Sequence, residues 1–296
     1  MKRMGAYDLL MQETIPELAA TGYIYRHRKT KARVVVISNE DTNKVFTIGF
    51  RTPPNDDTGV PHIMEHSVLC GSRKFPAKDP FVELAKGSLN TFLNAMTYSD
   101  KTVYPIASYN DKDFQNLMDV YLDAVFHPNI YIHEEIMKQE GWHYELESLD
   151  GDLTYNGVVY NEMKGVYSDP NQQLARLIQM SLLPDTTYAC ESGGEPTAIP
   201  QLTYEAFLDF HRKYYHPSNS YIYLYGNMDV EEKLAFIDRE YLSHYDYQKV
   251  DSKIHMQLAY PGPKVQTYSY SLAEDEELED NTFLSYNVVI GTSLDP

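Results

Sequence analysis

Alternating hydrophobic and polar positions in the first part of the chain predict strands. Three runs rich in β-branched and aromatic residues, separated by Asn, Asp and Lys turns, are predicted strands: 22–27, 32–38 and 44–50. Before them, apolar residues recur at helical spacing over residues 7–20. We therefore expect an N-terminal helical extension over residues 1–20 that leads into an antiparallel meander.

The remainder of the chain shows mainly the helical period. Apolar residues that recur at helical spacing predict a helix starting at Asp79–Pro80. The same spacing predicts further helices over 112–126, 172–183, 203–215 and 230–241. Strand patterns predict a hairpin (94–98 with 102–106) and strands at 142–147 and 220–227. This order of elements indicates an α+β fold, a mainly antiparallel sheet covered by helices.

Pro261-Gly262-Pro263 marks a predicted domain boundary. We expect one domain over residues 1–260, a linker over 261–266, and the beginning of a truncated second domain over 267–296. Two predicted strands at 265–272 and 282–290 belong to that second part. Two strands alone do not make a stable domain, so they are expected to open a second domain that continues in a longer protein.

Composition excludes several classes of protein. A formal net charge of −18 over 296 residues argues against nucleic acid as a partner, because phosphates need a basic surface. No apolar run reaches the roughly 18 residues of a membrane span, so no membrane association is expected. Two cysteines are too few for a disulfide framework. No apolar core follows the basic N-terminus, so we predict a bacterial cytoplasmic protein, with the mitochondrial matrix as the alternative if a transit peptide was removed.

The chemistry of the chain centres on His62-Ile63-Met64-Glu65-His66. On a helix, residues three and four apart share a face, so both imidazoles point the same way with Glu65 beside them. Two neutral nitrogens, a third protein ligand and an open position suit one catalytic zinc ion. His-x-x-Glu-His is the inverted form of the common zinc-protease signature. The alternative is a solvated His/Glu face of an ordinary helix.

The surrounding sequence supports a short buried helix and offers a third ligand. Thr58 is predicted to cap the helix, Pro61 lies in its first turn, and Gly71 is expected to end it in a left-handed conformation. Glu162 is a single carboxylate in an otherwise apolar run, where burial without a partner is costly. We expect zinc to be that partner. The alternative for Glu162 is an ion pair, on the surface with Lys164 or in the core.

Residues 59–76, 88–95 and 158–165 resemble the presequence protease and falcilysin branch of the pitrilysin and insulin-degrading-enzyme peptidases. The 96-residue separation of His66 and Glu162 also fits that branch. The resemblance implies a pitrilysin-like or mitochondrial-processing-peptidase-like domain that is a zinc-dependent endopeptidase acting on unfolded peptides. It implies that His62, His66 and Glu162 are the metal ligands and Glu65 the general base.

The same resemblance points to residues that bind substrate. Asn94 and Ala95 are expected to hold the substrate backbone beside the metal, and Leu69 and Phe81 to line the pocket for the residue before the scissile bond. From its own sequence Asn94 could instead be an ordinary turn residue of the hairpin. In the family, an Arg and a Tyr from the opposite half stabilise the oxyanion, and no equivalent is found here. We therefore expect weak or no activity from this chain alone.

Two other functions remain open. One is a non-catalytic scaffold or binding domain of the same fold, although such relatives typically lose part of the pentad, which is intact here. The other is an inverted-motif lyase such as S-ribosylhomocysteinase, whose chains are shorter and use a cysteine as the third ligand. In that case Cys190 would replace Glu162.

Overall fold

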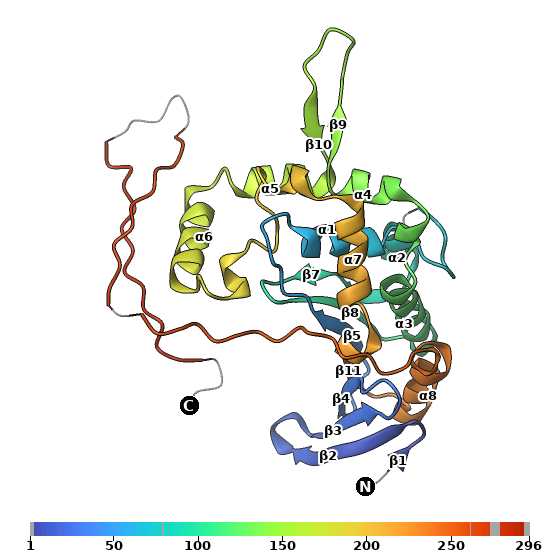
Figure 1. Cartoon of the computed structure of the whole chain (residues 1–296). Coiled ribbons are helices and arrows are strands. Elements are labelled where there is room, and N and C mark those ends of the chain that lie inside the picture. The colour runs from blue at the N-terminus through green and yellow to red at the C-terminus, as the bar shows by residue number, and fades with distance from the viewer. Residues whose placement is uncertain (1–2, 79, 261, 273–278, 293–296) are drawn as a thin grey trace.

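One mixed sheet forms the framework of the molecule (Figure 1). The computed structural model describes residues 3–78, 80–260, 262–272 and 279–292. Among these, nine strands pair in the order β1-β2-β3-β4-β11-β5-β8-β6, and β7 also pairs with β8. The strands are β1 (Arg3–Met4), β2 (Tyr7–Ile15), β3 (Ala20–His27), β4 (Arg33–Ser38), β5 (Lys44–Arg51), β6 (Asn90–Leu93), β7 (Met96–Thr97), β8 (Lys101–Ser108) and β11 (Ser220–Gly226). Only β11 and β4 pair in parallel.

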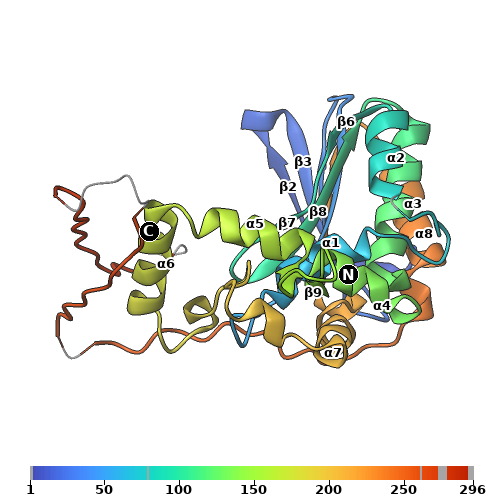
Figure 2. The same cartoon turned by 90° about the horizontal axis from the view of Figure 1, so that it is seen from above.

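Eight helices accompany the sheet in the described part of the chain. They are α1 (Val60–Val68), α2 (Pro80–Gly87), α3 (Asp111–Phe126), α4 (Glu134–Glu140), α5 (Val158–Val166), α6 (Pro170–Leu182), α7 (Tyr204–Tyr214) and α8 (Val230–Glu240). Viewed from above, α2, α3 and α8 lie along one face of the sheet (Figure 2). None of the described helices is long and apolar enough to cross a membrane. The predicted α+β class is confirmed.

Strict alternation along β11 shows why this sequence forms a strand with one core face. Ile222 and Leu224 are fully buried, whereas the alternate residues Tyr221, Tyr223 and Tyr225 are half-buried. Successive side chains of a strand point to opposite faces, so a period of two places one set in the core. On the neighbouring strand β5, Ile48 lies opposite Ile222 and is also fully buried, which continues the core across the sheet.

The N-terminal extension was predicted to be a helix, and the structure shows that this prediction is wrong. Residues 7–15 form β2, which pairs antiparallel with β3 along its whole length. The side chain of Tyr7 is buried, and its hydroxyl donates to the carbonyl of Leu234 in α8. Pairing with a long neighbouring strand satisfies the backbone of this segment, and this tertiary contact outweighs its weak helical period.

The predicted meander is also incomplete. β3 and β4 form an antiparallel pair, but β11 lies between β4 and β5 and separates these sequence neighbours. A strand from the end of the folded region therefore completes the middle of the sheet. The later helices agree with their predicted ranges within a few residues. Asp79, predicted to cap α2, lies outside the described residues.

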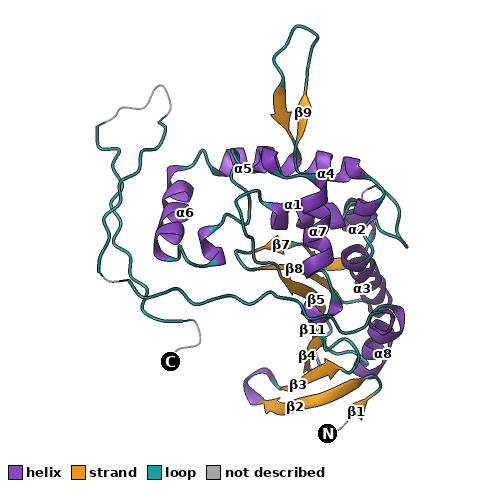
Figure 3. Cartoon of the chain, viewed as in Figure 1, coloured by secondary structure: helices purple, strands orange, loops and turns teal. Residues whose placement is uncertain are grey.

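A two-stranded hairpin projects from the body beside α4 and α5 (Figure 3). Its strands are β9 (His143–Glu145) and β10 (Thr154–Asn156). The predicted strand over 142–147 is therefore present but shorter. Trp142 at its base donates from Nε1 to the carbonyl of Leu202, which ties the hairpin to the body.

The described residues of the last part of the chain are extended and join no sheet. From Tyr245 onward the described residues form neither helix nor strand, so the two strands predicted at 265–272 and 282–290 are absent. The two segments touch through the Tyr270 hydroxyl, which donates to the carbonyl of Asn281, and through the rings of Tyr270 and Phe283. Strands gain stability from ladders and a packed face, and these segments have neither. The predicted division at 261–266 stays a prediction.

Candidate metal centre

The His-x-x-Glu-His pentad lies on α1, a short helix at the centre of the folded region (Figure 1). Ile63, Met64 and Val68 are fully buried, so this face of the helix is fixed in the core. Pro61 lies in the first turn, as predicted, but Thr58 does not cap the helix. Its hydroxyl donates to Asp56, and Gly59 with φ of 69° occupies the cap position. Gly71 has the predicted positive φ, 104°, but it does not end the helix, because Val68 is the last helical residue and Leu69 occupies the C-cap position.

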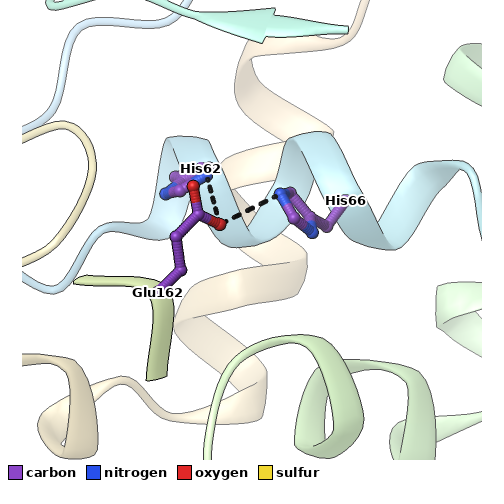
Figure 4. Close-up of side chains that lie close together, drawn as sticks. All are labelled: His62, His66 and Glu162. Carbon is purple, nitrogen blue, oxygen red and sulfur yellow. Dashed lines mark ion pairs between the residues drawn. The ribbon is translucent and has the colours of Figure 1, made fainter. Parts of the chain in front are cut away.

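Three potential metal ligands converge from two helices (Figure 4). His62 and His66 extend from α1, and Glu162 extends from α5. The Glu162 Oε2 atom lies 3.7 Å from His62 Nε2 and 3.9 Å from His66 Nε2. All three ligand atoms lie within 4.8 Å of one another. Glu162 is half exposed, so it is not the buried carboxylate that its apolar neighbours predicted.

The second nitrogen of each imidazole contacts a fixed acceptor. His66 Nδ1 lies 3.4 Å from a carboxylate oxygen of Glu140, a buried residue at the end of α4. His62 Nδ1 lies 3.1 Å from the carbonyl oxygen of Gly193. A carbonyl can only accept, so a neutral His62 carries its proton on Nδ1, which leaves the lone pair of Nε2 facing Glu162. Outer contacts of this kind orient imidazole ligands in metal sites.

The electrostatic surroundings of His66 favour its charged form. Burial alone would lower the pKa of His66, but the hydrogen bond with Glu140 and the carboxylates of Glu65, Glu140 and Glu162 together raise it. A cation placed between these groups would experience the same attraction. The centre is therefore preorganised for positive charge.

Glu65 occupies a different environment from Glu162. It is buried on α1. Burial is the main cause that raises the pKa of Tyr104, Tyr121 and Tyr215, and the nearby charge of Glu65 adds to the rise. Glu65 is not part of the three-residue ligand group of the described residues. A carboxylate beside the ligands but outside the ligand set is available for proton transfer.

The residues predicted to bind substrate lie on the elements around α1. Asn94 and Ala95 connect β6 to β7 at the edge of the sheet, and the Thr97 hydroxyl of β7 donates to the carbonyl of Pro61 on α1. Asn94 is exposed, and Ala95 is half-buried. Leu69 at the end of α1 and Phe81 on α2 are half-buried against the core. The structure thus places an exposed sheet edge beside the metal centre.

Sequence reasoning missed Glu140 and Gly193. The 74 residues from His66 to Glu140, and the 131 from His62 to Gly193, carry no local pattern that links them. A buried glutamate at the end of a short helix could have signalled a partner for Glu140. Gly193 contacts His62 through its backbone, which side-chain identity does not reveal.

The donor set fits zinc. Two imidazole nitrogens and one carboxylate are a known set for catalytic zinc, and bonds of about 2.0–2.1 Å would place tetrahedral ligand atoms about 3.3 Å apart. The separations of Glu162 from the two histidines, 3.7 Å and 3.9 Å, exceed this value by a few tenths of an ångström, and all three ligand atoms lie within 4.8 Å of one another, so a bound ion would draw them closer together. Cys190 does not belong to the ligand group. Burial raises the pKa of its thiol, which disfavours the thiolate that binds metal.

Comparisons with known proteins identify the family of this chain. Residues 36–166 match the family described as insulinase, peptidase family M16, and residues 201–284 match the peptidase M16 inactive domain. The second match runs across the predicted linker. The crystal structure of pitrilysin superposes with a TM-score of 0.65 at 17% identity, covering 84% of this chain and 25% of that one. The fold and the family matches together show that the chain belongs to the M16 peptidase family.

Within that family the sequence is presequence-protease-like. It is 50% identical to presequence protease 1 of Arabidopsis thaliana over 95% of this chain and 26% of that protein. It is 58% identical to protein HypA of Clostridium perfringens over 98% of this chain and 30% of that protein. The chain therefore spans less than a third of the length of these relatives.

Proposed function

We propose that this chain forms the zinc-binding catalytic domain of a metalloendopeptidase that hydrolyses unfolded peptides. The convergence of His62, His66 and Glu162, with Glu65 buried beside them, is the observation that carries the proposal. The three residues would hold one zinc ion. Bound zinc supplies Lewis acidity, which polarises a peptide carbonyl and brings the pKa of water to about 7.

Glu65 is the proposed general base. It accepts a proton from the attacking water and passes it to the leaving amine. Glu140 and Gly193 hold the imidazoles so that each Nε2 faces Glu162. These roles divide the carboxylates of the site into a ligand, a base and an orienting group.

The proposed substrate is an extended peptide. Asn94 and Ala95 would hold its backbone beside the sheet edge. The backbone N–H and carbonyl of Asn94 are already hydrogen-bonded to Pro105 and Tyr121, so Asn94 would act through its side-chain amide. Leu69 and Phe81 would contact the side chain before the scissile bond. Both are apolar and half-buried, which leaves part of each surface available for contact. The cellular location predicted from the sequence stays a prediction.

Metal content tests the ligand set directly. We expect about one zinc per native chain by elemental analysis and none in Glu162→Ala. Glu205→Ala is the matched control, because it removes an exposed glutamate from α7. It should keep its zinc. Native protein that stays free of zinc after reconstitution would refute the site in this chain.

Activity tests the contribution of the remaining domains. We expect weak or no cleavage of an unfolded fluorogenic peptide by this chain alone, because the chain spans 26–30% of its relatives. Each missing oxyanion donor would remove on the order of 3–4 kcal/mol of transition-state stabilisation. Robust cleavage by the isolated chain that a chelator abolishes would contradict this expectation.

A further inference from the structure

The loop over residues 191–195 joins the two helices that carry the metal ligands. The Gly193 carbonyl contacts His62 of α1 at 3.1 Å. A side chain at Gly193 would lie 2.9 Å from Cε of Met163, which follows Glu162 in α5. Gly193 therefore lies against both α1, which carries the two histidines, and α5, which carries Glu162.

Two further glycines allow this close approach. Gly59, which begins α1, has φ of 69°, and a Cβ there would lie 2.5 Å from the Cα of Gly194. Gly194 has φ of 100° and would itself contact Ile199 if it carried a side chain. L-residues rarely adopt these conformations. The backbone of the 191–195 loop thus lies directly against the start of α1.

Two carboxylates hold the loop by its backbone amides. Asp57 Oδ1 accepts the N–H of Glu191 at 2.7 Å, and the Asp57 carbonyl accepts the N–H of Glu195 at 2.8 Å. The Glu191 side chain accepts the N–H of Gly193 at 3.1 Å. Both ends and the centre of the loop are therefore fixed by hydrogen bonds.

Arg176 of α6 neutralises both carboxylates. Its Nη2 lies 3.0 Å from Asp57 Oδ1 and also donates to the carbonyl of Ala189. Its Nε lies 3.3 Å from Glu191 Oε2. The side chain is only 10% exposed, and its Nη1 has no hydrogen-bond partner among the described residues. This one buried guanidinium therefore fixes Asp57, Glu191 and the Ala189 carbonyl relative to one another.

We propose that Arg176 is a positioning residue for the metal centre, acting through the 191–195 loop on the tautomer of His62. This inference rests on the proposed zinc function. Without Arg176, Asp57 and Glu191 are two like charges with no counter-ion, and both turn towards water. The loop then loosens, and the Gly193 carbonyl no longer selects the Nδ1–H form that leaves Nε2 free for metal.

The experiment compares Arg176→Ala with Arg73→Ala. Arg73 forms an ion pair of similar length, 2.9 Å, with the fully buried Asp123, but neither residue contacts the 191–195 loop or the ligands. Three quantities are measured for each variant: zinc affinity by competition with a chromophoric chelator, stability towards denaturant, and the His62 tautomer. Long-range proton–nitrogen NMR of the metal-free chain in mildly alkaline buffer reports the tautomer.

We expect Arg176→Ala to lower zinc affinity about 10- to 100-fold and to convert His62 from one tautomer to a mixture. Arg73→Ala should lose stability but change neither quantity. For Arg176→Lys, the zinc affinity and the tautomer ratio of His62 should lie between those of the native chain and Arg176→Ala. Lysine keeps the charge but cannot contact both carboxylates and Ala189 in the same geometry. It also provides the comparison if Arg176→Ala does not fold.

Two results would overturn the inference. One is a single Nδ1–H tautomer of His62 that persists in both Arg176 variants. The other is an equal loss of zinc affinity in the alanine variants of Arg176 and Arg73, which would indicate a general loss of stability. Absence of zinc from the native chain, with an Arg176-dependent tautomer of His62, would refute the proposed function and leave the role of the loop standing.

Discussion

Residues 3–244 and residues 245–292 contain similar kinds of side chain but differ in structure. In the first region Ile63, Phe46 and Ile222 are fully buried in one core. In the second, Val265, Leu284 and Ile290 are at least 96% exposed. The second region nevertheless has strand-like sequence, with apolar and aromatic residues around Tyr268 and Tyr286. The difference is therefore not one of local propensity.

What differs is the presence of partners. In the first region every strand of the sheet has a neighbour, and α1, α3 and α7 bury apolar residues in the shared core. In the second region the described segments contact each other through Tyr270, whose hydroxyl donates to the carbonyl of Asn281 and whose ring contacts Phe283, and they form no β-ladder. β-propensity describes how well a residue suits a half-buried pleated surface, and without that surface it does not produce a strand.

Proteolysis should show the largest contrast between the two regions. We expect chymotrypsin to cut first near Tyr268, Phe283 and Tyr286, because this backbone needs no unfolding to reach the protease. Cleavage in the core requires opening against several kcal/mol, so its rate should be at least about a thousandfold lower. Mass spectrometry of early products measures this. First cuts inside α1 or α3 would contradict the comparison.

The same contrast explains which elements the sequence could predict. α3 has a full apolar stripe and an Asn110 cap, so its ends follow from local pattern. β2 was predicted as a helix, because its pairing with β3 is a tertiary contact that residues 7–15 do not encode. The insertion of β11 between β4 and β5 pairs residues that are at least 170 positions apart in the sequence. Periodicity identifies elements but does not determine strand order.

The candidate site divides in the same way. The shared face of His62 and His66 follows from one helical turn. For Glu162 only the family resemblance remains as a sequence argument, because the burial predicted from its apolar neighbours is wrong. Glu140, Gly193 and the contacts of Arg176 come from chain positions far away, and no spacing rule predicts them. The chemistry of the ligands was therefore readable in the sequence, whereas the groups that orient them required the fold.

Matched isoleucine variants test the difference in packing. Ile63 on α1 is fully buried, and its side chain lies against the backbone of Gly141, whereas Ile290 is 97% exposed. Ile63→Ala should lower the free energy of unfolding by about 2–5 kcal/mol, through lost burial and the cavity left behind. Ile290→Ala should change it by less than about 0.5 kcal/mol. Denaturant unfolding of both variants measures the two values, and similar losses would show that the second region is also packed.

A buried histidine of the first region should change the unfolding free energy with pH, whereas an exposed histidine of the second region should not. His211 lies on α7, where its Nε2 donates to the carbonyl of Val125 and its Nδ1 accepts from the Tyr131 hydroxyl. Burial lowers its pKa to about 4, although the Val125 carbonyl opposes this shift. The unfolded chain binds a proton near pH 6.5, whereas the folded chain does not until about pH 4. Stability from neutral His211 is therefore lost as pH falls through this window, on the order of 3 kcal/mol in total.

Glutamine variants isolate this contribution from the carboxylates that also titrate in acid. His211→Gln keeps a donor for Val125 but cannot be protonated, so its unfolding free energy should fall less steeply than that of the native chain. Between pH 7 and pH 5 the gap between the two curves should change by about 2 kcal/mol. His255→Gln, at an exposed position of the second region, should follow the native curve. Parallel curves for native protein and His211→Gln would mean that His211 is protonated equally in both states, and that the core around α7 is open to water.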